Sequence, residues 1–265
     1  MKWSPEAEAA IKKVPFFVRK RVRIRVEQEA KDAGKNLVTL DEVKATQKRY
    51  LQKMGDEVKG FQIENCFGPG GCPNRAAETD RLIASLEDRL KKGQLRAFLE
   101  KSVGGPLKHH HEFRVTVADC PNACSQPQIR DLGIVGATEP KLTDEACTLC
   151  EACVEVCKED AITLDEDEEM PVIEHDLCVR CGLCIQECPT GTLALGSTGY
   201  RVMLGGKLGR HPRLAEELPG LYSEDDVVNI LEACLNFFKK KSKRGKRFAQ
   251  IYWESKEELR IPDPS

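Results

Sequence analysis

Two four-cysteine runs constrain this chain more than any other feature of its sequence. Residues 147–157 carry the spacing Cys-x2-Cys-x2-Cys-x3-Cys, and residues 178–189 repeat that spacing and add a proline after the fourth cysteine. The x2 spacing lets one loop direct three thiolates at a single point, as a cubane [4Fe–4S] cluster requires. In paired runs of this kind, the fourth cysteine of each run ligates the other cluster. The runs therefore predict two [4Fe–4S] clusters.

This crosswise arrangement divides the eight cysteines into two ligand sets. The first cysteine set is Cys147, Cys150, Cys153 and Cys188. The second cysteine set is Cys157, Cys178, Cys181 and Cys184. Structural zinc is the alternative, because Cys-x2-Cys pairs also suit a tetrahedral zinc site. Two complete four-cysteine runs favour clusters, although Lys158 stands where the usual run has a proline.

Four further cysteines form a third cysteine set with different spacing: Cys66, Cys72, Cys120 and Cys124. The two pairs are separated by 47 residues, so their spacing alone is a moderate sign of metal binding. The glycine- and proline-rich stretch 68–71 lets the backbone turn tightly around a bulky ligand. The thirteenth cysteine, Cys234, lies on the apolar face of a predicted helix, where a buried core thiol is expected.

Composition limits the class of protein. The 265 residues are 40% apolar and 32% charged, which allows one sizeable core or two small ones. The sequence contains no apolar run of eighteen residues and begins without an apolar signal segment, so we expect a cytoplasmic protein with no membrane span. In that compartment, grouped thiols indicate metal ligands rather than disulfides. No zinc-finger or RNA-binding signature accompanies the basic N-terminal stretch, and nucleic acid is not an expected partner.

Charge is distributed unevenly along the chain. Residues 1–55 carry 14 basic and 7 acidic side chains, whereas residues 138–196 carry 3 basic and 15 acidic ones. The acidic segment has the charge of a small electron carrier, toward which a basic partner could be steered. The alternative is that both segments are ordinary solvated surfaces.

Hydrophobic periodicity predicts an α+β protein. Helical spacing runs through residues 5–50, with a break at Gly34 and a second helix after Thr39. Strands are predicted at residues 61–63, 113–117, 132–136 and 200–204. Further helices are predicted from about Arg75 to Lys92 and after Ser223, which stands three residues before Asp226 as in a capping box.

The third cysteine set and two nearby segments resemble the sirohaem domain of the sulfite and nitrite reductases. The matching segments are Cys120-Pro121-Asn122-Ala123-Cys124, residues 131–136, and the glycine-rich residues 205–215. The resemblance implies that the third cysteine set holds a [4Fe–4S] cluster and that Cys124 bridges it to a sirohaem iron. It also assigns Lys207, Arg210 and Arg213 to the carboxylates of that haem. Only one of the two pseudo-symmetric halves of such reductases is recognisable in this chain.

Two other segments carry resemblances of their own. Residues 137–196 resemble bacterial two-cluster ferredoxins. Residues 1–55 resemble a short helical module of the light-independent protochlorophyllide reductases through Trp3, Ala7, 14–19, Val26-Glu27, Ala30, Gly34 and Val38-Thr39. The expected domains are 1–55, the sirohaem domain at 56–136 and 197–252, the insert at 137–196, and a tail at 253–265.

These features predict a sulfite-reductase-type oxidoreductase with three [4Fe–4S] clusters and a sirohaem. Its expected partners are a small inorganic anion (sulfite or nitrite), an electron-donor protein, and a second copy or partner subunit that covers the haem. The alternatives are an electron-transfer subunit without its own substrate site, and a scaffold around structural zinc. His109-His110-His111, Lys108 and Arg114 could orient an anion, although a solvated loop is the simpler interpretation. The basic run Lys239–Arg247 is expected to be the solvated end of the last helix, with a docking face for an acidic carrier as the alternative.

Iron content tests the assignment of the twelve cysteines. Protein purified without oxygen is expected to hold about twelve cluster irons, four for each cubane. Elemental analysis beside a protein assay measures this ratio. Two zinc ions and negligible iron in well-reconstituted protein would exclude the cluster assignment.

Overall fold

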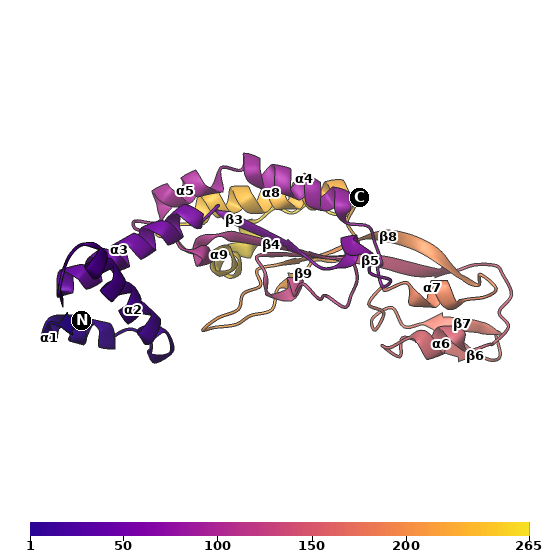
Figure 1. Cartoon of the computed structure of the whole chain (residues 1–265). Coiled ribbons are helices and arrows are strands. Elements are labelled where there is room, and N and C mark those ends of the chain that lie inside the picture. The colour runs from indigo at the N-terminus through magenta and orange to yellow at the C-terminus, as the bar shows by residue number, and fades with distance from the viewer. Residues whose placement is uncertain (265) are drawn as a thin grey trace.

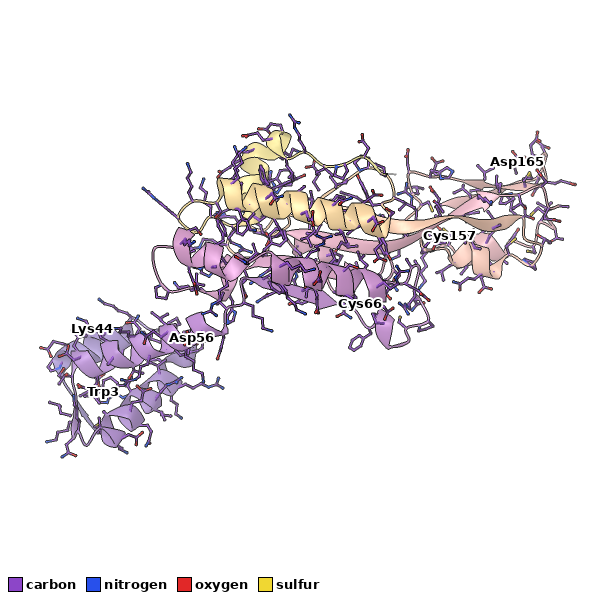
Figure 2. The ribbon with its side chains drawn as sticks, turned by 90° about the horizontal axis from the view of Figure 1, so that it is seen from above. Trp3, Lys44, Asp56, Cys66, Cys157 and Asp165 are labelled. Atoms are coloured by element: carbon purple, nitrogen blue, oxygen red, sulfur yellow. The ribbon has the colours of Figure 1, made fainter. Side chains whose placement is uncertain are left out.

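The computed structural model describes residues 1–264 as an elongated molecule with three parts in a row (Figure 1). A helical module lies at the N-terminal end, a five-stranded sheet covered by helices forms the middle, and a small cysteine-rich unit lies at the far end. The view from above shows the same order, with Trp3 and Cys157 in opposite end parts (Figure 2). Helices and strands are mixed as the α+β prediction requires, which confirms the predicted fold class.

The N-terminal module packs three helices around a short parallel strand pair. The helices are α1 (Pro5–Lys12), α2 (Phe16–Asp32) and α3 (Leu40–Glu57), and the strands are β1 (Lys2–Trp3) and β2 (Leu37–Val38). The helical pattern breaks at Pro15, which leaves the chain free to turn between α1 and α2. The small core is formed by Ala7, Val26, Ala30 and Val38, with Trp3 packed against it. The indole of Trp3 donates to Glu27 at 2.7 Å. Residues that carry the N-terminal resemblance therefore build this core.

The central sheet has the strand order β3-β4-β5-β8-β9. Its strands are β3 (Phe61–Asn65), β4 (Phe113–Ala118), β5 (Leu132–Leu142), β8 (Leu193–Leu204) and β9 (Glu216–Glu217). The first three run parallel, and β8 is antiparallel to both of its neighbours. Since β3 and β4 are parallel neighbours, Cys66 and Cys120 follow their strands at the same edge of the sheet. This topology brings together two cysteine pairs that are far apart in sequence.

Helices cover one face of this sheet (Figure 1). They are α4 (Asp80–Lys92), α5 (Leu95–Ser102) and α8 (Glu224–Lys241), while α9 (Phe248–Ser255) packs against α8 and lies level with the sheet in this view. Short 3-10 turns lie in the connecting segments: η1 (Gly68–Gly70), η2 (His109–His111), η3 (Pro127–Ile129) and η4 (Lys256–Glu258). Alternate residues of β4, among them Phe113, Val115 and Val117, meet leucines of α4 in one core. The capping box expected at Ser223 is present, and it starts α8. The helices α5 and α9 were not predicted.

A long strand pair connects the cysteine-rich unit to the central sheet. The strands β5 and β8 stay paired up to Leu142 and Leu193, with a register shift at Glu139/Pro140. Between them lie α6 (Ala152–Val156), β6 (Ile162–Asp165), β7 (Met170–Ile173) and α7 (Leu183–Glu187). This unit has its own small core around Cys153, Ile162, Cys184 and Leu193. None of the described helices is long and apolar enough to cross a membrane.

The leftover thiol is buried as predicted. Cys234 lies in α8 with none of its surface exposed, among the core residues of the sheet and helices. Burial raises the pKa of this thiol above its usual range, so it stays protonated at neutral pH. It takes no part in any of the three cysteine sets.

Replacement of this thiol therefore tests core packing alone. Cys234→Ala removes one buried sulfur and is expected to lower the free energy of unfolding by about 1 kcal/mol, with iron content unchanged. Chemical denaturation and iron analysis measure the two quantities. Loss of a complete cluster would show that the ligand assignment is wrong.

Candidate cluster-binding site

The structure brings the first cysteine set together. Cys147, Cys150, Cys153 and Cys188 line one small cavity. Cys188 belongs to the second run, and it reaches this cavity from the end of α7. Burial raises the pKa of Cys153, and the neighbouring Cys147 and Cys188 add to the shift. Four thiols from two distant runs thus surround one space, which fits a four-thiolate cluster.

The second cysteine set surrounds a larger cavity of about 120 Å³. Cys157 reaches it from the end of α6, and Cys178, Cys181 and Cys184 come from the second run. Burial and the crowding of these thiols raise the pKa of Cys184 to about 12. Thiols crowded in this way release their protons to solvent readily only when a metal cation binds the resulting thiolates. The described residues contain no disulfide, so all eight thiols of the runs are free.

The two runs share one loop conformation. In the first, Leu149 and Glu151 have φ of 54° and 61°, and in the second, Arg180 and Gly182 have φ of 59° and 75° at the equivalent positions. Three of these four residues are not glycine, so the left-handed backbone conformation costs free energy, which other interactions of the folded loops must offset. The turn directs the amide of Leu149 at Cys147 Sγ, 3.4 Å away. Such amides stabilise thiolates in a cluster site.

Other backbone amides serve the fourth cysteine of each run. Ala161 N donates to Cys157 Sγ at 3.3 Å, and Leu193 N donates to Cys188 Sγ at 3.4 Å. Although burial opposes it, hydrogen bonds from Leu193, Thr190 and Gly191 lower the pKa of Cys188. The chain therefore supplies hydrogen-bond donors to Cys157 and Cys188, the two cysteines that are grouped with the other run.

The third cysteine set meets at the carboxyl edge of β3 and β4. Burial raises the pKa of Cys120, and the neighbouring Cys66, Cys72 and Cys124 contribute to that shift. Cys120 is buried and Cys124 is exposed. The four thiols are therefore neighbours, with the proposed bridging cysteine on the open side.

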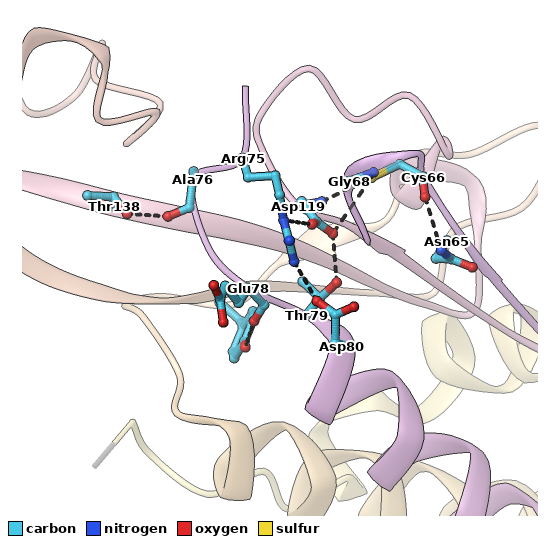
Figure 3. A network of polar contacts seen from close by, with 11 residues as sticks. Asn65, Cys66, Gly68, Arg75, Ala76, Glu78, Thr79, Asp80, Asp119 and Thr138 are labelled. Atoms are coloured by element: carbon cyan, nitrogen blue, oxygen red, sulfur yellow. Dashed lines mark hydrogen bonds and ion pairs between the residues drawn. The ribbon is translucent and has the colours of Figure 1, made fainter. Parts of the chain in front are cut away.

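Asp119 holds the two loops of this set together (Figure 3). Its carboxylate is buried and accepts from Arg75 Nε and Thr79 Oγ1, both at 2.6 Å. Its backbone amide donates to Cys66 Sγ at 3.3 Å, and its carbonyl accepts from Ala76 N at 2.9 Å. A side chain at Gly68 would overlap the same carboxylate. Sequence reasoning missed Asp119, and its position directly before Cys120 is the only local signal for it.

These contacts explain one difference from the predicted secondary structure. A helix was expected from about Arg75, but α4 begins at Asp80. Arg75 pairs with Asp119 and Asp80, while Ala76 donates its amide to Asp119. The residues before Asp80 therefore bind the cysteine loop instead of forming a helical turn.

The cavity of the second cysteine set also touches the third. Cys120, Pro121 and Asn122 line it together with Cys157, Cys178, Cys181 and Cys184. Thr138 connects the same two parts of the chain, because its amide donates to Arg180 O at 2.8 Å and its hydroxyl donates to Ala76 O. A cluster held by the second set would therefore lie next to the Cys120 loop.

The three basic residues assigned to haem carboxylates occupy one hairpin. Lys207 and Arg213 exchange backbone hydrogen bonds at 2.9 Å, and the Arg213 guanidinium stacks on Trp253 at 3.9 Å. Gly206 packs so closely on Gln128 and Arg130 that a Cβ there would clash with their backbone. The hairpin is therefore held against the segment that follows Cys124. Arg210 is exposed in the same loop.

Comparison with known families agrees with this geometry. Residues 61–254 match the model of the nitrite and sulphite reductase 4Fe-4S domain. The chain belongs to this family. Residues 3–46 match the proto-chlorophyllide reductase 57 kD subunit, which confirms the N-terminal resemblance. Over 41 residues, the chain is 54% identical to one of the subunits of the light-independent protochlorophyllide reductase of Pelodictyon phaeoclathratiforme, covering 16% of this chain and 8% of that one.

Two curated relatives and one solved structure place the chain further within the family. It is 32% identical to the coenzyme F420-dependent sulfite reductase of Methanocaldococcus jannaschii, over 69% of this chain and 27% of that one. It is 25% identical to one of the subunits of the anaerobic sulfite reductase of Salmonella typhimurium, over 54% of this chain and 42% of that one. The chain thus spans less than half the length of either relative. The crystal structure of dissimilatory sulfite reductase I shares the fold, with a TM-score of 0.50, 15% identity, and coverage of 78% and 55%.

The role of Asp119 can be tested by an isosteric change. Asp119→Asn removes the charge opposite Arg75 in a buried place, which is expected to cost about 2–3 kcal/mol of unfolding free energy. Because the two cysteine loops then lose their common anchor, iron content is expected to fall from about twelve to about eight per chain.

Asp80→Asn is the matched control. It removes the other carboxylate partner of Arg75, but its side chain is 56% exposed, so a cost below about 1 kcal/mol and full iron content are expected. Equal stability and iron content in the two variants would show that Asp119 does not organise this site.

Proposed function

We propose that this chain is the iron–sulfur half, or a subunit, of a sulfite-reductase-type enzyme. It would hold three [4Fe–4S] clusters and a sirohaem, and it would reduce sulfite or nitrite. One observation carries the proposal beyond family membership: the Cys120–Asn122 loop and the four thiols of the second cysteine set line the same cavity. This contact joins the predicted electron-carrying insert to the predicted haem-coupled site.

The three cysteine sets would each hold one cluster, with Cys124 as the thiolate shared with the sirohaem. When bound, these groups supply single electrons and a reducing site for a small oxyanion. Reduction of sulfite to sulfide takes six electrons. Family membership supports at least one 4Fe–4S site in this chain. The chain's own share of the chemistry is to hold and space these groups.

The insert offers a docking place for an electron donor. Residues 138–196 have a net charge of −12, and this unit projects from the far end of the sheet (Figure 1). Cys150 of the first cysteine set is exposed there. A donor with a basic face would be attracted to this end, and the attraction would weaken as salt screens it. Electrons would then pass from the first set to the second and on to the third.

The haem side of the proposal depends on the hairpin that packs behind Cys124. Lys207 and Arg213 lie side by side in that hairpin, where they would meet carboxylates of the macrocycle. Cys124 is exposed and the matched relatives are more than twice as long as the part covered, so a second copy or a partner subunit would close this side. Closure would keep water from reduced intermediates.

The exposure of Cys124 also favours a second candidate function. In this alternative, the chain carries electrons through its clusters to a partner and has no substrate site of its own. An absorption spectrum of protein purified without oxygen separates the two. A chlorin-type red band supports the reductase, whereas a brown spectrum without that band supports the electron-transfer subunit.

Two cysteine substitutions test the order of the path. Cys150→Ser damages the first cysteine set, so turnover with a protein donor is expected to fall, while a small strong reductant still supports activity. Cys124→Ser removes the proposed bridging thiolate, and activity is expected to disappear with both donors. Activity of each variant with each donor is the measurement.

Electron paramagnetic resonance provides the control, because Cys124→Ser is expected to leave the signals of the two insert clusters intact. Equal losses for both variants with both donors would reject the relay. Unchanged activity in Cys124→Ser would reject the sirohaem assignment.

A further inference from the structure

A group of basic side chains lies around η2, outside the three cysteine sets. Lys108, His110 and His111 come from this turn, Arg114 from the start of β4, and Arg247 from the residue before α9. Lys108, Arg114 and Arg247 all act electrostatically on the ring of His110. Gly245 brings its backbone against the ring of His111, 3.6 Å from where its Cβ would lie. Residues from two distant parts of the sequence are therefore gathered in one place.

Two nitrogens in this group lack hydrogen-bond partners. Within residues 1–264, the buried side-chain nitrogens and oxygens without a partner are Arg114 Nε and Arg247 Nε. Both belong to this group. A buried charged donor without an acceptor is rare in native proteins and calls for a compensating group nearby.

The carboxylates near this group do not balance its charge. Asp131 lies between the two arginines, but its oxygens accept from backbone amides, Arg114 N at 2.9 Å and Ala249 N at 3.2 Å. Glu112 accepts from the amides of Lys59 and Gly60, from the side chain of Gln62 and from His109. Three permanent cations, Lys108, Arg114 and Arg247, thus stand against two carboxylates that are already engaged by other donors.

Burial and the positive charge of this group lower the pKa values of its two histidines. Burial lowers the pKa of His110, and Lys108, Arg247 and Arg114 lower it further. The pKa of His111 is lowered by burial and then by His110, Lys108 and Arg247. His110 and Lys108 are exposed, so the positive region is open to solvent.

This group is distant from the proposed cluster sites. Arg114 lies near the start of β4 and Cys120 follows its end, so the two are separated by about 20 Å along the strand at roughly 3.3 Å per residue. The Lys207–Arg213 hairpin begins beside the group, since Gly205 N donates to Asp131 O at 3.0 Å, but the cations that act on His110 are Lys108, Arg247 and Arg114. The three cluster sites do not account for this group.

We propose that this group binds a divalent oxyanion of the phosphate or sulfate type. Each arginine would turn the edge that carries its unpartnered Nε toward the ligand, so that Nε and a neighbouring Nη donate to its oxygens, and Lys108 would approach from the solvent side. Three cations against two carboxylates leave a net positive charge, which a bound oxyanion would offset. The site would lie where the N-terminal module joins the sheet, since Glu112 anchors Lys59 and Gly60 beside it.

Histidine titration by nuclear magnetic resonance tests the proposal on the full-length protein with its clusters in place and oxidised. The probes are inorganic phosphate and sulfate, with chloride at matched ionic strength as the reference. A bound oxyanion stabilises the imidazolium form, so the pKa values of His110 and His111 are expected to rise in phosphate or sulfate relative to chloride. The larger rise identifies the preferred oxyanion. His175 lies in the acidic insert and serves as an internal control.

Variants make the test specific. Arg247→Gln and Arg114→Gln are expected to remove most of the oxyanion-dependent rise, whereas Arg81→Gln, an exposed arginine of α4, is expected to retain it. Two substitutions are used so that misfolding of one leaves the other informative. Equal pKa values in all three salts, or equal responses in Arg247→Gln and Arg81→Gln, would overturn the proposal. Since the readout is independent of turnover, failure here would leave the proposed reductase function untouched.

Discussion

The buried carboxylate of Asp119 is the contact on which the candidate site depends. It lies between two cysteine loops whose nearest members, Cys72 and Cys120, have 47 residues between them. A cluster can bind only if the two loops are held at a fixed distance from each other. Bringing them together across the residues between them lowers the conformational entropy of the chain. Asp119 offsets part of this cost through Arg75, Thr79 and the amide of Ala76. Because Arg75 neutralises it, the carboxylate can remain buried beside thiolates without adding net negative charge to the loops.

The β5–β8 strand pair provides a second level of organisation. It belongs to the central sheet at one end and carries the cysteine-rich unit at the other. Because the paired strands are continuous with the central sheet, they fix the position of the unit relative to it. The second cysteine set therefore lies beside the Cys120 loop, although the unit has its own core. Thr138 strengthens this placement by bonding to residues of both parts. The proposed path between sites therefore depends on sheet geometry rather than on a flexible linker.

Charge is segregated along this elongated molecule. The acidic insert occupies one end, and the basic group around η2 lies at the opposite end of β4 from the cysteine loops. This separation lets each end attract a different kind of partner without mutual cancellation, since screening limits the range of both fields. The proposed oxyanion site and the proposed donor-docking surface are thus compatible in one chain.

The sequence by itself determined the features that depend on local spacing. The two cysteine runs, the capping box at Ser223, the buried position of Cys234 and four of the five strands of the central sheet follow from patterns within a few residues, since ligand loops, helix ends and pleated strands have short fixed periods. The crosswise grouping of Cys157 and Cys188 also followed from the motif, and the structure places each thiol beside the other run's cavity.

Only the tertiary structure decided the contacts between distant segments. Strand order and helix packing determine the partners of Asp119, the late start of α4, the shared cavity at Cys120 and the placing of both Arg114 and Arg247 near His110. The helices α5 and α9 and the strands β1, β2, β6, β7 and β9 were missed because they are short, and packing against the rest of the chain stabilises them more than their own sequence pattern does. Local periodicity carries no information about which loops a parallel sheet will bring to one edge.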